Sequence, residues 1–378
     1  MRNSLLLLLL SFAVPALSQT TPKTAGPVPQ RHEYIIHNFK TESGVTLPEA
    51  HIVYGTYGAL NADRSNAILL PSHYMANLTG YGFLIKSPSN PDGALDTSRL
   101  FLVTSELFGN GRSSSPSNTP APFDGPRFPV MTIRDNVNAV HQLLTEELHI
   151  QHLRAVIGFS MGAQQAFQWA VSYPTFMDKA VATSGTAKTY GHGIVRLEGQ
   201  IAALTADPAF MDGNYKTEPA RGLEAFGMVW AGWLYSQEWW RKELWRGASA
   251  PGTTFEQYMF SFRKRFNADA NDYILQARSW ESNNVGMTTL ADGKPTIFGG
   301  DVEKALASIK VPLLYMPSAT DLYFPLEDAK YEAAFIPHGV LMPIPSLWGH
   351  PAGAGASPAD KRFLNQNIGT FLSRKVHP

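Results

Sequence analysis

The segment AVIGFSMGAQQAFQWAVSYP, residues 155–174, restricts the fold of this chain more than any other part of it. A short apolar run ends at Gly158, and a helical pattern follows Ser160, with one apolar face made by Ala163, Ala166, Phe167, Ala170 and Val171. The glycines therefore fit G-x-S-x-G at a strand-to-helix joint, the setting of a nucleophile elbow. A serine in such a turn has a strained backbone and needs neighbours without bulk, which Gly158 and Gly162 provide. We predict that Ser160 is a nucleophile.

An acyl-transfer nucleophile also needs donors for the negative charge that develops on the substrate oxygen. The elbow places the Met161 N–H at the N-terminus of a helix, where the helix dipole favours that charge. The second donor is expected from the loop after the third strand, PSHYMANLTGYG. Within one or two residues, we predict that it is the backbone N–H of Tyr74. His73 of the same loop could instead line the acyl pocket.

A serine hydroxyl needs a base, and eleven histidines are available. His350, in PSLWGHPAG, lies in a glycine-rich loop just after the last strand-like run. His338 precedes that run and His377 is close to the C-terminus, so both are poorer candidates. We predict that His350 takes and returns the proton of Ser160.

The acid that orients the base should follow the preceding strand. Asp321, in MPSATDLYFP, comes closely after the apolar run VPLLYMPS. Glu327 and Asp328 are nearby but read as the start of the next helix. The resulting order of Ser160, Asp321 and His350 along the chain is the one expected of an α/β-hydrolase.

Strand-like and helix-like segments alternate through most of the chain. The segment from Thr132 to Leu148 reads as a helix, with Thr132 and Asp135 placed to form a capping box. Such alternation is typical of an α/β fold with a mostly parallel, doubly wound sheet. Together with the elbow it predicts the α/β-hydrolase fold. The predicted strands lie in residues 33–39, 50–58, 66–74, 99–107, 153–158, 179–185, 310–318 and 339–346.

The composition changes after Gly185. Residues 186–309 read mainly as helices and loops and hold six of the eight tryptophans. The strands and helix that follow could hardly form a core alone, so we predict one α/β domain, residues 32–185 and 310–378, with residues 186–309 inserted as a helical lid. Two independent domains are the alternative. Most of the tryptophans are expected to pack the lid against the core, and a substrate channel or a dimer face are the other interpretations.

The N-terminal residues MRNSLLLLLLSFAVPALSQ combine an arginine, an apolar run and small residues at a cleavage position. We predict a signal peptide over residues 1–18 and a flexible leader over residues 19–31. The protein is then expected to be secreted or periplasmic, without stable membrane insertion. A buried N-terminal helix or an uncleaved anchor is the alternative.

Charge and cysteine content exclude several kinds of protein. The chain has 31 basic and 31 acidic residues and no long basic run, so nucleic acid is not an expected partner. It has no cysteine, which excludes a cysteine nucleophile, thiolate zinc sites and iron–sulfur clusters. His149 and His152 are spaced like ligands but lack an acidic partner pattern, so we expect no metal and no cofactor.

The chain resembles the homoserine O-acetyltransferase branch of the α/β-hydrolase superfamily. The resemblance implies a doubly wound sheet with a helical lid, often in a homodimer, and a triad at Ser160, Asp321 and His350. Family members move an acetyl group from acetyl-CoA to the homoserine hydroxyl through an acyl-enzyme. The matching segments are LDTSRLFLVTSELFGNG (95–111), RFPVMTIRDNV (127–137), GFSMGAQQAFQWAVSYP (158–174), ADPAFMDGNY (206–215), EPARGL (218–223), TDLYFP (320–325) and GH (349–350).

Two departures from this family bear on the substrate. The family typically has Asp after the catalytic histidine, and this chain has Pro351. The family arginine held to grip the amino-acid carboxylate is missing, since residues 222–232 contain no Arg or Lys, and Arg221 is a weak substitute. A bidentate arginine is the usual grip on a carboxylate, so both departures argue against homoserine.

The chain is therefore predicted to be a serine-dependent acyl-transfer enzyme that works through an acyl-Ser160 intermediate on a small-molecule acyl substrate. A secreted hydrolase of an ester or related compound is the preferred interpretation, because acetyl-CoA is a cytosolic metabolite. The alternative is an O-acetyltransferase from acetyl-CoA to homoserine or another hydroxyl acceptor. A third hypothesis is an inactive fold used for binding or for dimerisation through the lid, against which the complete triad argues.

Overall fold

A computed structural model of the chain describes residues 26–289 and 296–374. The signal peptide predicted for residues 1–18 lies outside the described residues. So do His377 and most of the leader predicted for residues 19–31. No helix in the described part of the chain is long and apolar enough to cross a bilayer.

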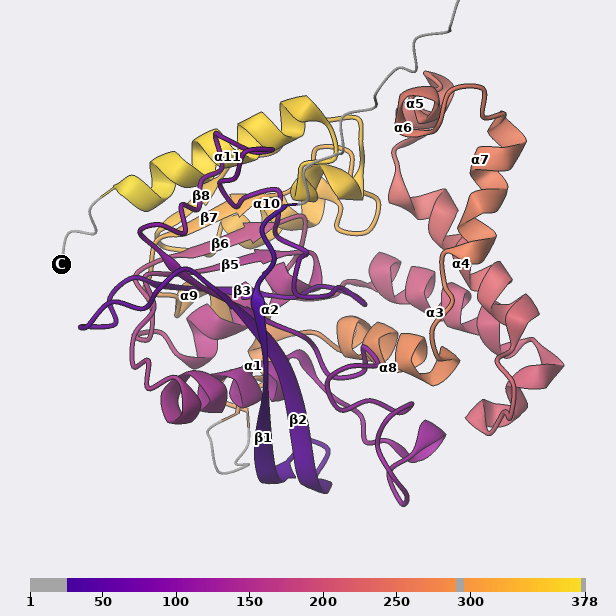
Figure 1. The fold of residues 1–378 in the computed structure, drawn as a ribbon, viewed down its shortest axis with the longest axis horizontal. Coiled ribbons are helices and arrows are strands. Elements are labelled where there is room, and N and C mark those ends of the chain that lie inside the picture. The colour runs from indigo at the N-terminus through magenta and orange to yellow at the C-terminus, as the bar shows by residue number, and fades with distance from the viewer. Residues whose placement is uncertain (1–25, 290–295, 375–378) are drawn as a thin grey trace, which may run out of the picture.

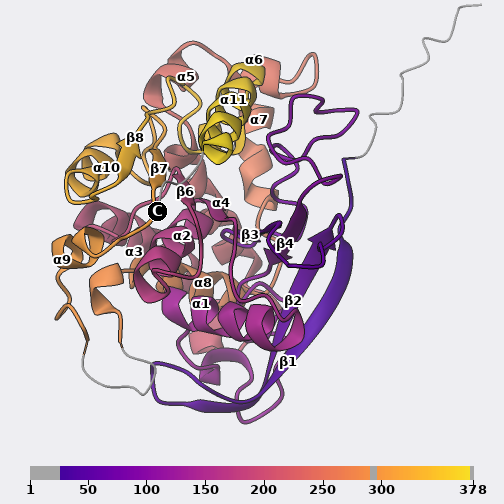
Figure 2. The same ribbon diagram turned by 90° about the vertical axis from the view of Figure 1, so that its left-hand side faces the viewer.

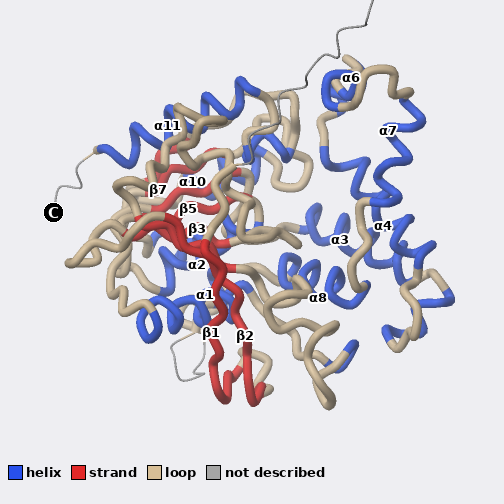
Figure 3. Tube along the Cα trace, in the orientation of Figure 1, coloured by secondary structure: helices blue, strands red, loops and turns tan. Residues whose placement is uncertain are grey.

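The centre of the protein is a sheet of eight strands: β1 (Gln30–Lys40), β2 (Thr46–Tyr57), β3 (Ala67–Pro71), β4 (Phe101–Ser105), β5 (Ala155–Phe159), β6 (Ala180–Thr183), β7 (Leu313–Met316) and β8 (Gly339–Leu341). Their order is β1-β2-β4-β3-β5-β6-β7-β8. Figure 3 shows the strands in red. β2 is antiparallel to β1 and β4, and all other neighbours are parallel. The mostly parallel sheet predicted from the sequence is confirmed. β1 begins inside the predicted leader, because Gln30 and Arg31 already pair with β2.

The described residues contain these α-helices: α1 (Ile133–Gln142), α2 (Met161–Ser172), α3 (Gly191–Thr205), α4 (Ala220–Leu234), α5 (Gln237–Arg241), α6 (Trp245–Ala248), α7 (Phe255–Ser261), α8 (Ala270–Glu281), α9 (Val302–Ala307), α10 (Leu326–Ala333) and α11 (Pro358–Ser373). α1 and α2 cover one face of the sheet and α11 covers the other (Figures 1 and 2). Alternate strand residues supply the two cores. Leu69 and Val103 pack on the side of α1 and α2, and Ile68 and Leu70 pack on the side of α11.

The helix predicted from Thr132 starts as expected and ends differently. Thr132 caps α1 and forms the predicted capping box with Asp135. The regular helix stops at Gln142, and the chain continues as a π-helical turn, Leu143–Glu147. The apolar residues of this turn, Leu143 and Leu144, are buried, so packing of the predicted apolar face continues through the wider turn.

The described residues between β6 and β7 are mainly helical. The helices α4 to α7 are grouped on the right of Figure 1, beyond the sheet. Four of its tryptophans are buried, namely Trp230, Trp239, Trp245 and Trp280. Their rings pack on other aromatic rings of the core, so for these four the expectation of core packing is confirmed.

Candidate active site

The turn between β5 and α2 has the strain that the sequence predicts for a nucleophile elbow. Ser160 has φ 58° and ψ −124°, a conformation that L-residues rarely adopt. A Cβ on Gly158 would lie 1.8 Å from the carbonyl oxygen of Gly162. A Cβ on Gly162 would lie 2.4 Å from the carbonyl oxygen of Pro71. The turn therefore requires both glycines for steric reasons.

Ser160, His350 and Asp321 form one hydrogen-bonded chain. His350 Nε2 lies 3.0 Å from Ser160 Oγ, and His350 Nδ1 lies 2.9 Å from Asp321 Oδ2. A serine just before a helix usually caps it, but the Ser160 side chain makes no capping bond. Ser160, His350 and Asp321 are 2%, 5% and 4% exposed. The structure thus brings the three predicted residues together in a place shielded from water.

The backbone after β7 fixes the orientation of the Asp321 carboxylate. Asp321 Oδ1 accepts hydrogen bonds from the backbone N–H groups of Tyr323 at 2.8 Å and Phe324 at 3.2 Å. This leaves Oδ2 to accept from His350 Nδ1–H. With the proton on Nδ1, the unprotonated Nε2 is the atom that faces Ser160 Oγ, as a base requires.

Residues of the helical segment hold the loop that carries His350. A Cβ on Gly349, which has φ 61°, would lie 2.7 Å from the carbonyl oxygen of Leu234 at the end of α4. Ser236, the N-cap of α5, donates its hydroxyl to the carbonyl oxygen of Leu347 at 2.6 Å. The position of the candidate base therefore depends on contacts made by residues of the segment between β6 and β7.

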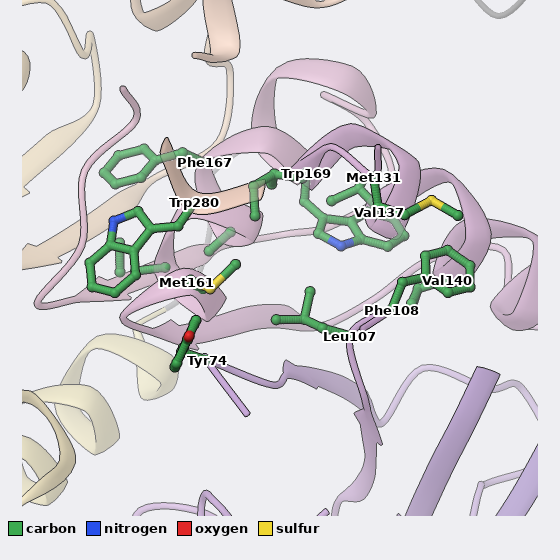
Figure 4. Packing of buried hydrophobic residues seen from close by; sticks show 14 of the residues in the cluster. Tyr74, Leu107, Phe108, Met131, Val137, Val140, Met161, Phe167, Trp169 and Trp280 are labelled. Atoms are coloured by element: carbon green, nitrogen blue, oxygen red, sulfur yellow. The ribbon is translucent and has the colours of Figure 1, made fainter. Parts of the chain in front are cut away.

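The loop after β3 carries the predicted oxyanion donor Tyr74. Among the described residues, neither the Tyr74 N–H nor the Met161 N–H donates to another group. The Tyr74 ring is buried, stacks on Trp230 with ring centres 5.4 Å apart, and lies 6.1 Å from the Trp280 ring. Figure 4 shows Tyr74 and Trp280 in the same buried cluster as Met161. The Tyr74 ring thus anchors the loop, while the Tyr74 backbone N–H donates to no other group of the described residues.

His73, which the sequence suggested as a lining residue of the acyl pocket, packs beside the candidate active site as an uncharged imidazole. Its ring centre lies 4.9 Å from that of Phe159, which in turn lies 4.9 Å from that of His350. Burial, and secondly the nearby charge of His350, lower the pKa of His73 to about 3. At neutral pH, His73 therefore adds no positive charge that would oppose protonation of His350.

α8 holds the Tyr74 loop from the opposite side. The Tyr74 hydroxyl donates to the carbonyl oxygen of Tyr273 at 2.8 Å. Gln276 Oε1 accepts from the Met75 N–H at 2.6 Å, and Gln276 Nε2 donates to the carbonyl oxygen of Phe108 at 3.1 Å. Met75 has φ 53°, so its turn is strained and needs this support. The sequence does not predict Gln276, because a single glutamine in a helix carries no signal for a contact with a distant loop.

Gln276→Met should lower the kcat measured with an ester substrate by about tenfold with little change in KM, because the strained turn loses a buried acceptor and the predicted oxyanion donor shifts. Steady-state kinetics with 4-nitrophenyl acetate would measure this. Gln168→Met is the matched control, since Gln168 is equally buried but donates to Thr288 and Ser172. An equal loss of kcat in both variants would contradict a positioning role for Gln276.

The other candidates from the sequence lie apart from this hydrogen-bonded chain. His338 and Glu327 are exposed, and Asp328 is half-buried on α10. Arg221 is exposed at the start of α4. Pro351 follows His350 in a 3-10 turn, His350–Ala354.

The two histidines with ligand-like spacing are surface residues. His149 is exposed, and His152 is exposed and pairs with Asp178 at 2.8 Å. Over residues 26–289 and 296–374, no group of three or more His, Asp or Glu side chains is placed to hold a metal ion.

Comparison with known proteins gives consistent matches. Residues 91–355 match the family described as the alpha/beta hydrolase fold. The chain is 36% identical to the ethyl acetate hydrolase of Pseudomonas veronii over 86% of this chain and 89% of that protein. It is 26% identical to the homoserine O-acetyltransferase of Chlorobium chlorochromatii over 89% of this chain and 93% of that protein. The solved acetyl esterase MekB matches with a TM-score of 0.84 and 33% identity, over 91% of this chain and 97% of that chain. The predicted resemblance is confirmed.

Proposed function

Because the chain belongs to the alpha/beta-hydrolase family, we propose that it hydrolyses short-chain carboxylic esters through an acyl-Ser160 intermediate. Its relatives are esterases and acetyltransferases, so the protein is an enzyme of acyl transfer. The observation that carries the proposal is the hydrogen-bonded chain from Ser160 through His350 to Asp321 at a strained elbow.

The geometry of the hydrogen-bonded residues Ser160, His350 and Asp321 supports the following acylation step. His350 Nε2 takes the Ser160 proton as Oγ bonds to the carbonyl carbon of the ester. The negative charge on the carbonyl oxygen is stabilised by the N–H groups of Met161 and Tyr74. His350, doubly protonated and paired with Asp321, gives the proton to the leaving alkoxide, so that an alcohol departs and the acyl group stays on Ser160.

Deacylation repeats these steps with water. His350 Nε2 takes a proton from water as its oxygen bonds to the acyl carbon, and the proton returns to Ser160 Oγ when the ester bond breaks. The products are a carboxylic acid and the original serine. A strongly buried site favours a small acceptor, and the signal-peptide pattern of residues 1–18 supports water over acetyl-CoA chemistry.

The second candidate is O-acetyl transfer from acetyl-CoA to homoserine or another hydroxyl acceptor. The match to a homoserine O-acetyltransferase over most of both chains favours it. It would use the same Ser160, His350 and Asp321. Against it stands Pro351, which follows His350 at the position where the homoserine O-acetyltransferase family typically has Asp.

A single pair of assays separates the two functions. The mature protein is incubated with acetyl-CoA, with and without L-homoserine, and free CoA is followed, while 4-nitrophenyl acetate is assayed in parallel. We expect hydrolysis of the aryl ester and no homoserine-dependent release of CoA. Release of CoA that requires homoserine would reject the hydrolase in favour of the transferase.

A further inference from the structure

Arg196 is a buried cation without a bonded anion in the described part of the chain. It lies on α3 and is 3% exposed. Its Nη1 donates to Gln200 Oε1 at 3.2 Å, whereas Nε and Nη2 have no hydrogen-bond partner among the described residues. No carboxylate of those residues is therefore hydrogen-bonded to the guanidinium.

Such a residue is expensive to bury. A guanidinium stays charged at neutral pH, and each buried donor without an acceptor costs the full desolvation of that group. Burial lowers the pKa of Arg196, the direction expected of a cation that no bonded anion compensates. Nε and Nη2 are therefore able to donate to an acceptor from outside the described residues, such as water or a group of a ligand.

The guanidinium lies in the aromatic wall of the candidate active site. Its central carbon is 4.5 Å from the ring centre of Trp280 and 4.2 Å from that of Tyr323. The Tyr323 ring centre is 4.7 Å from that of His350. The Trp280 ring is 6.1 Å from that of Tyr74, which carries the proposed oxyanion donor. Arg196 thus packs on aromatic rings that also neighbour His350 and Tyr74.

The two unused donors have the geometry of a carboxylate fork. Nε–H and one N–H of Nη2 point from the same edge of the guanidinium, so the two oxygens of one carboxylate can accept them in parallel. The neighbouring rings hold the cation through cation–π contacts, and no atom of either residue accepts a hydrogen bond from Nε or Nη2. We infer that Arg196 binds a carboxylate of the substrate, so that the enzyme prefers esters bearing a carboxylate near the scissile bond. This inference rests on the hydrolase function proposed for Ser160.

The test compares matched pairs of esters in the wild type and in Arg196→Gln. 4-Nitrophenyl hemisuccinate and its methyl ester place the carboxylate, or its neutral counterpart, on the acyl side. 4-Acetoxybenzoate and its methyl ester place it on the alcohol side. In at least one of the two pairs, the wild type should hydrolyse the anionic ester with a higher kcat/KM than its neutral methyl ester. Arg196→Gln should lower that preference by about 100-fold and leave hydrolysis of the neutral ester nearly unchanged.

Two further measurements keep the inference testable. Arg196→Lys keeps the charge without the fork and should recover only part of the preference. The product that carries the tested carboxylate, succinate or 4-hydroxybenzoate according to the preferred pair, should raise the Tm of the wild type and not that of Arg196→Gln. If Arg196→Gln does not fold, the wild type and Arg196→Lys decide the question.

The outcomes also separate this inference from the proposed function. A wild type without preference in either pair, or a loss of neutral and anionic esters alike in Arg196→Gln, would overturn the role of Arg196. Hydrolysis of the neutral esters that survives Ser160→Ala would instead overturn the proposed function.

Discussion

Ser160→Ala should lower the turnover of 4-nitrophenyl acetate by about a millionfold, since the attacking atom is removed. The fold should survive the change. Ser160 has φ 58°, and alanine is no more strained there than serine, while the lost hydroxyl bonds only His350 Nε2 among the residues that the structure describes. The measurement is the steady-state rate beside the Tm, which should remain close to that of the wild type.

Ser184→Ala is the matched control. Ser184 is also buried and also has a positive φ, 43°, but its hydroxyl has no hydrogen-bond partner among the described residues. Its removal should leave turnover close to that of the wild type. A serine-directed organophosphate should add its mass to the peptide that contains Ser160. Activity retained in Ser160→Ala, or a label on another serine, would show that the nucleophile is misassigned.

The parts of the site that the sequence predicts are those fixed by short-range geometry. Gly158 and Gly162 lie within two positions of Ser160. A Cβ on Gly158 would clash with Gly162 inside the turn, and a Cβ on Gly162 would clash with Pro71 at the end of β3. Asp321 and His350 each follow a strand-like run. Because parallel strands end at one edge of the sheet, chain order alone brings these two loops close to the elbow.

The parts that the sequence does not predict depend on long-range packing. Gln276 meets Met75, and Arg196 meets Tyr323, only because α8 and α3 fold back on the sheet. Neither residue has a spacing pattern or a neighbour that marks it. Arg196 in particular reads as an ordinary charged residue of an amphipathic helix, and only its burial without a bonded anion sets it apart.

Local pattern also fails where two helical geometries fit the same residues. The apolar face from Ile133 to Leu148 suits a continuous α-helix. The structure replaces its last turn by the π-helical residues Leu143–Glu147. Both geometries bury Leu143 and Leu144, so the hydrophobic pattern alone does not distinguish them.

Asp321→Asn should lower turnover by about ten-thousandfold, through the tautomer of His350. The side-chain oxygen of the asparagine would keep the two hydrogen bonds from the Tyr323 and Phe324 N–H groups, now made to Asp321 Oδ1. Its NH₂ group would then face His350 Nδ1 and donate to it. The imidazole proton would move to Nε2, which could no longer accept the proton of Ser160.

Asp328→Asn is the control for this change, because Asp328 is the rival acid and differs from Asp321 in its contacts. It is half-buried on α10 and bonds neither His350 nor the loop that holds it. Its substitution should leave kcat within about threefold of the wild type, as expected of a residue outside any catalytic contact. Because Asn is nearly isosteric with Asp, a lower kcat at an unchanged Tm reports the tautomer and not unfolding. A large loss of kcat in Asp328→Asn together with a small loss in Asp321→Asn would show that Asp328 is the acid. His350 would then have to turn from Asp321 toward α10.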